Sequence, residues 1–69
     1  MEYFLAVAQE KNFTRAAARL NITQQTLSAH IGALEKELGC RLFDRTKPLR
    51  LTYAGETLLR YAGEITLLN

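Results

Sequence analysis

The stretch NITQQTLSAHIGALEKELG, residues Asn21–Gly39, decides the fold of this 69-residue chain. Its apolar residues recur at steps of four, three and four, the spacing of one helical face: Leu27, Ile31, Leu34 and Leu38. Thr23 is expected to cap the start of the helix, because its hydroxyl can accept from an unpaired amide of the first turn. Gly39 is expected to end it in the left-handed conformation that glycine adopts easily. The pattern therefore predicts a helix over residues 23–38 with small polar residues at its N-terminal end.

A second helix is predicted just before it, in NFTRAAARLN, residues Asn12–Asn21. Thr14 is the expected N-cap, and Phe13 can pack against the helix as a hydrophobic staple. Asn21 supplies a stop, since asparagine tolerates a left-handed backbone. Three residues give this helix a small, closely packing face: Ala16, Ala17 and Leu20. Two helices joined by so short a turn predict a helix-turn-helix.

The segments on either side complete the domain. MEYFLAVAQEK, residues 1–11, places four apolar residues on one broad helical face and should stop near Lys11 and Asn12: Phe4, Leu5, Val7 and Ala8. CRLFDRTKPLRLT, residues 40–52, changes to an alternating pattern that breaks at DRTKP. Pro48 suits a turn or an edge strand, so we expect a two-stranded hairpin, or wing, over residues 41–51. The predicted fold is mainly α: a winged helix-turn-helix of three helices plus a short β-hairpin wing.

A last helix is predicted in YAGETLLRYAGEITLLN, with Thr52 as its cap. Gly55 and Gly63 would each cost up to about 1 kcal/mol in a helix interior. Ala54 begins an apolar face whose later members would make a dimer helix: Leu58, Leu59, Ala62, Ile65 and Leu68. A second copy of the chain would cover this face, as in a coiled-coil pair. The alternative is that the helix folds back on the core of its own domain.

Composition limits what the chain can do. Its 69 residues make at most one domain, and the 48% apolar fraction is that of a globular protein. A single cysteine, Cys40, excludes an internal disulfide and is expected to be a small buried hydrophobe. No stretch approaches the roughly 20 apolar residues of a membrane span, and no signal peptide is visible. We therefore expect a cytoplasmic protein with no membrane partner.

Enzymatic chemistry finds no support in the residues. The only serine, Ser28, and the only histidine, His30, stand two residues apart on a helix and face different directions, so they form no nucleophile pair. His30 is interpreted as a helix-flank residue. The acidic residues are interpreted as surface charges rather than an acid–base pair: Glu35, Glu37, Glu56 and Glu64. We expect no catalytic residue, no metal site and no cofactor in this domain.

Four polar residues lie away from the apolar face of the 23–38 helix: Gln24, Gln25, Thr26 and Ser28. A glutamine amide combines a donor and an acceptor, which matches the edge that adenine presents in the major groove. Helix-turn-helix proteins insert the N-terminal part of their second helix into that groove. We therefore expect these four residues to read bases in double-stranded DNA. The alternative is ordinary capping and a solvated surface.

Phosphate contacts are expected from helix ends and from the wing. The amides at Thr14 and Thr23 carry partial positive charge and favour a phosphate oxygen, and Arg15 is close to the first of them. Net charge is only +2, but residues 41–50 hold four basic residues against one acid. Three of them would contact the DNA backbone or an A·T-rich minor groove: Arg45, Lys47 and Arg50. A solvated basic loop is the alternative.

Four motifs together resemble the N-terminal DNA-binding domain of LysR-type transcriptional regulators: FTRAAARL, TQQTLSAHIGALEKELG, LFDRT and LTYAGE. The resemblance implies a winged helix-turn-helix over residues 1–52 and the start of a linker helix over residues 53–69. It also implies an effector-binding domain that this chain lacks, with a small-molecule effector. The resemblance further implies homodimers that form through the linker helix, with tetramers possible in the full-length protein. We expect each recognition helix to enter one half of an inverted repeat.

The match to the family's pattern also assigns roles and shows departures. It implies base reading by Gln24, Gln25, Thr26 and Ser28. It also implies phosphate contacts by Thr14, Arg15 and Thr23, and wing contacts by Arg45, Lys47 and Arg50. Gln25 stands where many members have proline, and Ala29 where many have a basic residue. Ala33 replaces a frequent arginine, and the wing segment KPLR, residues 47–50, is short. We therefore expect a larger share of affinity from four residues: Arg15, Arg45, Lys47 and Arg50.

Two rival interpretations stay open. A small helical protein-interaction module would use its last helix as the working surface, and loss of charge from the wing would change nothing. A winged-helix DNA-binding protein outside this family would share the fold and the reading helix. An LTYAGE-type linker that continues into an effector domain would separate the two DNA-binding possibilities.

Overall fold

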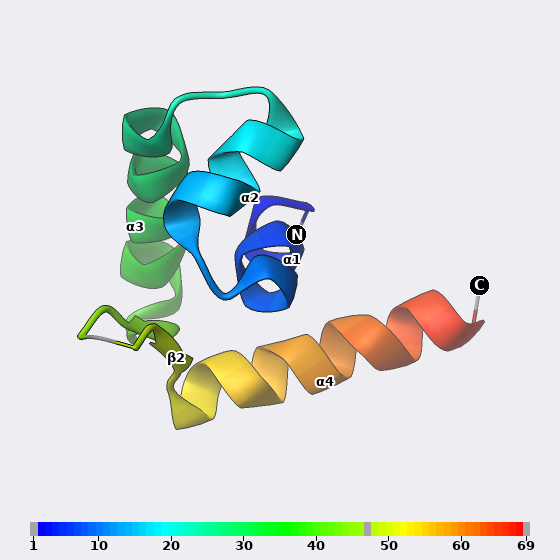
Figure 1. Cartoon of the computed structure of the whole chain (residues 1–69). Coiled ribbons are helices and arrows are strands. Elements are labelled where there is room, and N and C mark those ends of the chain that lie inside the picture. The colour runs from blue at the N-terminus through cyan, green and yellow to red at the C-terminus, as the bar shows by residue number, and fades with distance from the viewer. Residues whose placement is uncertain (1, 47, 69) are drawn as a thin grey trace.

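The computed structural model describes residues 2–46 and 48–68, with side chains described through residue 62. The elements follow one another as α1 (Glu2–Glu10), α2 (Phe13–Leu20), α3 (Gln24–Leu38), β1 (Phe43–Asp44), β2 (Arg50–Leu51) and α4 (Tyr53–Leu68). The predicted winged helix-turn-helix is confirmed. Figure 1 shows α3 along one side of the domain, α1 and α2 packed beside it, and α4 crossing below α1.

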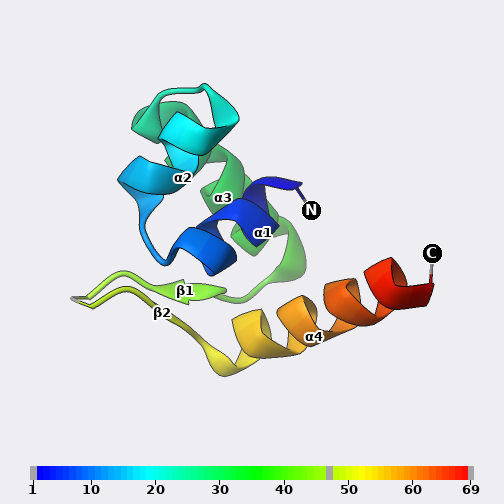
Figure 2. The same ribbon diagram turned by 45° about the vertical axis from the view of Figure 1, so that its right-hand side comes forward.

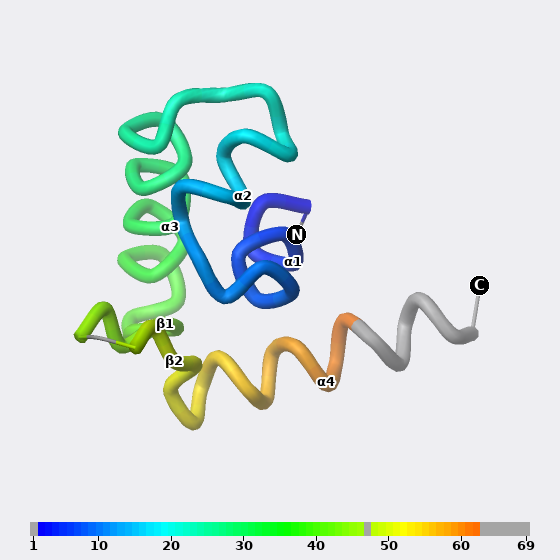
Figure 3. The backbone as a smooth tube through the Cα atoms, in the orientation of Figure 1, coloured from blue at the N-terminus to red at the C-terminus, as the bar shows by residue number. Residues whose placement is uncertain are grey.

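The hairpin lies between the three-helix body and α4 (Figure 2). Its two strands are antiparallel, with Phe43 opposite Leu51 and Asp44 opposite Arg50. The tube in Figure 3 shows that the hairpin follows α3 and leads into α4. The wing is therefore held at its base, between α3 and α4.

The core is apolar and is shared by the first three helices and β1. Its buried members are Phe4, Ala6, Val7, Ala8, Ala16, Ala17, Leu27, Ile31, Leu42 and Phe43. The Phe43 ring lies 5.4 Å from that of Phe4 and 5.8 Å from that of Phe13, measured between ring centroids. This aromatic cluster fixes the start of the wing against α1 and α2.

The predicted ends of α3 are confirmed. The Thr23 hydroxyl accepts from the Thr26 amide at 3.1 Å, and Gly39 ends the helix with φ of 75°. Asn21 ends α2 in the left-handed region, with φ of 61°. These caps set the short turn between α2 and α3.

The predicted N-cap of α2 was wrong. Asn12 caps the helix, since its side chain accepts from the Arg15 amide at 3.0 Å. Lys11 has φ of 55° and turns the chain sharply after α1, so the helix begins at Phe13. Thr14 consequently lies inside the first turn, and its hydroxyl is used elsewhere.

The prediction that Cys40 is buried was also wrong, because the residue is exposed. The apolar face of α3 is fully buried at Leu27 and Ile31, but Leu38 is 50% exposed. The C-terminal end of α3 thus extends beyond the core. Cys40 follows this end, where its amide donates to the Glu35 carbonyl at 3.1 Å.

α4 is capped as predicted, since the Thr52 hydroxyl accepts from the Gly55 amide at 3.1 Å. Leu58 and Leu59 are partly buried against the core of their own domain, and Ala62 is buried. Ile65 and Leu68 lie outside the residues whose side chains are described. Part of the face that we assigned to a dimer is therefore covered within the chain.

Gly55 lies where α4 packs against the start of the wing. Gly55 is buried, and a Cβ there would overlap the Leu42 carbonyl oxygen. Only glycine therefore lets α4 approach the wing this closely.

No helix in the part of the chain that the structure describes is long and apolar enough to cross a membrane.

Candidate nucleic-acid interface

The first turn of α3 presents polar side chains to solvent. Gln24, Gln25 and Thr26 are exposed and Ser28 is half-buried, whereas Leu27 between them is fully buried. The burial of Leu27 fixes the rotation of the helix, so its polar neighbours face outward. The structure brings the four predicted reading residues together on one surface.

Side chains of the preceding helix and turn hold two of these residues. The Thr14 hydroxyl of α2 donates to Gln24 Oε1 at 3.1 Å. The Thr23 hydroxyl donates to Thr26 Oγ1 at 2.8 Å. Two of the residues predicted to contact phosphates, Thr14 and Thr23, therefore lie directly beside the reading residues.

The wing reaches the same surface through Arg45. Its guanidinium carbon lies 4.6 Å from the centroid of the Phe13 ring, and its Nη1 donates to Ser28 Oγ at 2.7 Å. A cation over an aromatic face is attracted by the ring quadrupole. Arg45 thus joins α2, α3 and the wing by one side chain.

Two shallow hollows flank the Arg45–Ser28 contact. The first is lined mainly by the start of α2, the start of α3 and the wing, including Thr14, Gln24, Thr46 and Pro48. The second includes Gly32, Lys36 and Arg41. The surface from α2 to the wing is therefore continuous, on the side of the molecule where α3 stands in Figure 1.

Lys36 and Arg41 extend this surface and were not predicted as site residues. Both line the second hollow together with Ser28 and Arg45. A signal was present in the sequence, because Ser28, Gly32 and Lys36 follow at steps of four and so lie on one helical face. Both side chains are exposed and basic.

The basic residues predicted for phosphates differ in their surroundings. Arg15 is exposed on α2, and Arg50 is exposed on β2 opposite Asp44. Lys47 lies outside the described residues. Arg19, a further basic residue near the end of α2, is engaged within the domain. Its Nη1 lies 3.4 Å from Glu10 Oε2 and donates to Gln9 Oε1 at 2.7 Å.

Asp44 shapes the turn at the tip of the wing. Its Oδ1 accepts from the Thr46 amide at 3.1 Å and from the Thr46 hydroxyl at 2.8 Å. These two hydrogen bonds, with smaller contributions from the charges of Arg50 and Arg41, hold the pKa of Asp44 below its ordinary value. The carboxylate is therefore charged at neutral pH and offsets part of the wing's positive charge.

Glu35 has a role that the sequence did not reveal. The residue was interpreted as a solubilising charge, but its Oε2 accepts from the Leu42 amide at 2.7 Å and the Phe43 amide at 3.2 Å. It thereby ties the base of the wing to α3. His30 agrees with the prediction of a helix-flank residue: its ring meets that of Tyr3 edge-on, with centroids 4.6 Å apart.

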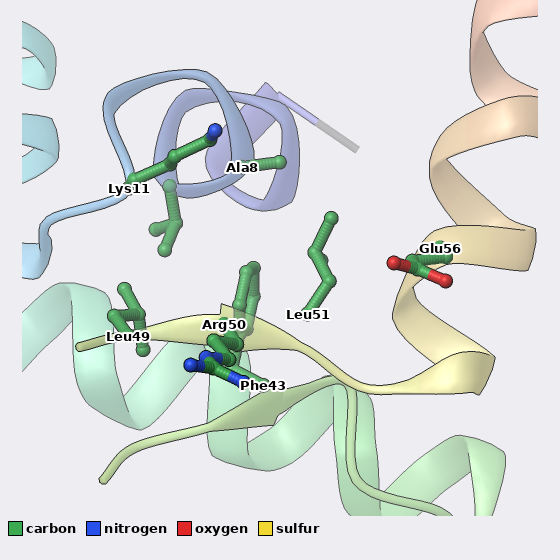
Figure 4. A pocket seen from close by; sticks show the side chains of 8 residues that line it. Ala8, Lys11, Phe43, Leu49, Arg50, Leu51 and Glu56 are labelled. Atoms are coloured by element: carbon green, nitrogen blue, oxygen red, sulfur yellow. The ribbon is translucent and has the colours of Figure 1, made fainter. Parts of the chain in front are cut away.

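A third hollow lies on the other side of the wing, between α1, β2 and α4 (Figure 4). Leu51 points from β2 toward α1, Leu49 lies just before the strand, and Glu56 lines the hollow from α4. Lys11 and Arg50 complete its charged lining. Leu49 and Leu51 thus pack against the core, while Arg50 between them is exposed.

The family follows from comparison with known proteins. The sequence model for the bacterial regulatory helix-turn-helix proteins of the lysR family matches residues 1–56. The chain belongs to this family. It is a LysR-type helix-turn-helix DNA-binding domain, and the resemblance of its four motifs is confirmed.

Two regulators illustrate the similarity. XapR, an HTH-type transcriptional regulator of Escherichia coli K12, is 53% identical over 60 residues, which make up 86% of this chain and 20% of XapR. AlsR, an HTH-type transcriptional regulator of Bacillus subtilis, is 50% identical over 62 residues, or 88% of this chain and 20% of AlsR. The chain therefore spans about a fifth of the length of these curated relatives.

Solved structures agree with the sequence comparison. The DNA-binding domain of BenM in complex with benA site 1 DNA matches with a TM-score of 0.88 and 41% identity, over 94% of this chain and 74% of that chain. The complex of the CbnR DNA-binding domain with DNA matches with a TM-score of 0.86 and 38% identity, over 97% of this chain and 78% of that chain.

Proposed function

We propose that this LysR-type domain reads a specific DNA sequence, with the first turn of α3 in the major groove and the wing on the DNA backbone or in the minor groove. The observation that carries the proposal is the outward-facing row of polar side chains on α3, joined by Arg45 to a basic wing. Phosphate contacts set the register of such a domain, and base contacts set its sequence preference. The crystal structures of BenM and CbnR domains with DNA support this proposal.

We assign base reading to Gln24, Gln25, Thr26 and Ser28, and backbone contacts to Thr14, Arg15, Thr23, Arg45, Lys47 and Arg50. Gln25 and Arg15 separate the two roles best, because both side chains are exposed. Arg45 separates them poorly, since its contacts with Phe13 and Ser28 would also be lost on substitution.

The test is selection of bound duplexes from a random pool, followed by binding measurements at two salt concentrations. Gln25→Ala should weaken binding to the selected sequence by about 1–3 kcal/mol and relax the preference at its base pair. Arg15→Ala should weaken binding to every sequence similarly and reduce the salt slope by about 1. Equal behaviour of the two variants on selected and random DNA would overturn this division of roles.

We further propose that the protein acts as a homodimer on an inverted repeat, with α4 as the pairing helix. The domain would be the DNA-binding part of a cytoplasmic bacterial regulator whose other domain binds a small effector, with tetramers possible at full length. The named relatives are transcriptional regulators, which favours a role without enzymatic activity. If the selection enriched no sequence, and loss of charge from the wing changed nothing, the protein-interaction module would be the better interpretation.

A further inference from the structure

We infer that hydrogen bonds within the domain occupy acceptor positions of Gln24, Thr26 and Ser28. These three side chains are left to act as hydrogen-bond donors, and they should contact base atoms that accept hydrogen bonds. The inference rests on the proposed function and specifies the kind of base edge that this surface recognises. It assigns the hydroxyls of Thr14 and Thr23 and Nη1 of Arg45 to positioning, through Gln24, Thr26 and Ser28. The phosphate contacts proposed above then fall to the backbone amides of Thr14 and Thr23 and to the other guanidinium donors of Arg45.

Arg45 and Ser28 give the clearest case. A guanidinium has only donors, so the 2.7 Å contact must run from Arg45 Nη1 to Ser28 Oγ. One acceptor position of the serine oxygen is then filled by a charged donor. A hydroxyl that accepts such a bond becomes a stronger donor, because hydrogen bonds in a chain polarise one another. The Ser28 proton is therefore directed to a partner outside the domain.

Thr14 and Gln24 repeat the arrangement with an amide. The Thr14 hydroxyl donates to Gln24 Oε1 at 3.1 Å, which turns the carbonyl side of the amide toward α2. The Nε2 group, a pure donor, is left to face outward. Gln24 is thereby drawn away from the two-bond contact with adenine, which needs the Oε1 acceptor for N6 and the Nε2 donor for N7.

Thr23 and Thr26 form the third pair. The Thr23 hydroxyl accepts from the Thr26 amide at 3.1 Å and donates to Thr26 Oγ1 at 2.8 Å. The Thr26 hydroxyl then has its own proton free for a partner. Gln25 differs from all three, because no side chain in the described part of the structure donates to it, and it keeps both functions of its amide.

These contacts predict the chemistry of the half-site. In the major groove, acceptors are N7 and O6 of guanine, N7 of adenine and O4 of thymine, whereas N4 of cytosine and N6 of adenine are donors. The atoms that Gln24, Thr26 and Ser28 contact should be acceptors, so these residues should meet a purine N7, guanine O6 or thymine O4, and not cytosine N4 or adenine N6. Adenine reading through both amide atoms should fall to Gln25.

Thr14→Val tests the inference, because valine keeps the shape and the backbone amide of threonine but removes the donor. The variant frees Gln24 Oε1. In random-pool selection, the base preference at one position of the half-site should shift toward adenine by about fivefold, which corresponds to the free energy of one hydrogen bond. Thr57→Val is the matched control. Its hydroxyl donates to the Tyr53 carbonyl on α4 at 3.0 Å, far from α3 along the chain, and base preference should stay unchanged.

A second measurement uses the unmodified protein on the selected duplex. Replacing one purine at a time by its 7-deaza analogue removes the N7 acceptor, and we expect about fivefold weaker binding at the purines that face the donors. A simple phosphate contact by the Thr14 hydroxyl would instead lower the affinity of Thr14→Val for all sequences without changing any preference.

The outcomes separate the inference from the proposed function. No enriched sequence for the unmodified protein would overturn both. An enriched sequence whose preferences are the same for Thr14→Val and the unmodified protein would overturn the inference alone. A shift toward adenine in Thr14→Val, absent from Thr57→Val, would establish it.

Discussion

At the base of the wing, hydrogen bonds join backbone amides to a side chain of α3, beside buried apolar residues. Glu35 accepts from the amides of Leu42 and Phe43, and both of these residues are 1% exposed. On the first turn of α3, hydrogen bonds of similar length join side chains that are mostly exposed. Burial makes a hydrogen bond costly to lose, whereas water replaces an exposed one. We therefore expect substitutions at the base of the wing to change the stability of the domain, and substitutions on the reading surface to change the binding of a partner.

The largest expected effect is at the base of the wing. Gly55→Ala would place a Cβ against the Leu42 carbonyl oxygen and 2.8 Å from Leu51 Cδ2. Backbone cannot rotate away as a side chain can, so we expect a loss of about 3 kcal/mol in the free energy of unfolding. Urea denaturation followed by circular dichroism would measure it.

Gly32→Ala is the matched control on the reading surface. Apart from the helix backbone and the two neighbouring residues, no atom of the described residues lies within 4 Å of the added Cβ, and alanine favours a helix over glycine. We expect a gain in stability of about 0.5–1 kcal/mol. If the two alanine variants changed stability in the same direction, the contrast between the two regions would be lost.

The next largest effect on the free energy of unfolding is expected at Glu35. Glu35→Ala leaves the amides of Leu42 and Phe43 without their acceptor in a buried setting, and we expect unfolding to require about 2 kcal/mol less. Hydrogen exchange of these two amides should quicken in the folded protein. Glu37→Ala, at an exposed position on the same helix, should change stability by no more than about 0.5 kcal/mol. Comparable losses in both variants would contradict the anchoring role.

Local signals predicted much of this fold from the sequence. The structure confirms the cap at Thr23, the stops at Asn21 and Gly39, and the burial of Leu27 and Ile31 on α3, all of which depend on neighbouring residues. The cap of α2 was misjudged because Asn12 and Thr14 are both good caps. The left-handed turn at Lys11, which the structure revealed, decides between them.

The contacts that assemble the site join residues far apart in the chain. Ser28 meets Arg45 across 17 positions, and Glu35 meets the Leu42 and Phe43 amides across seven and eight. Residue types predicted which positions would face outward, but the path of the chain after Gly39 determines these partners. The exposure of Cys40 was missed for the same reason, because composition does not tell where the core ends. Gly55, counted from the sequence as a cost to the helix, is required by the close approach of Leu42.

The smallest expected effect on stability is at the tip of the wing, where Asp44 and Thr46 are exposed. The pKa of Asp44 lies below its ordinary value mainly because Thr46 donates through its amide and its hydroxyl. A lowered folded-state pKa means that the unfolded chain takes up the proton first, so the contribution of Asp44 is present above its ordinary pKa and is lost as pH falls through the folded value. The Thr46 amide resonance, followed by NMR from neutral to acidic pH, should move with a midpoint below the ordinary pKa of an aspartate. Asp44→Asn keeps an oxygen acceptor but does not titrate there. If its Thr46 resonance moved over the same pH range, a group other than Asp44 would account for the change, and the assignment of this transition to Asp44 would be wrong.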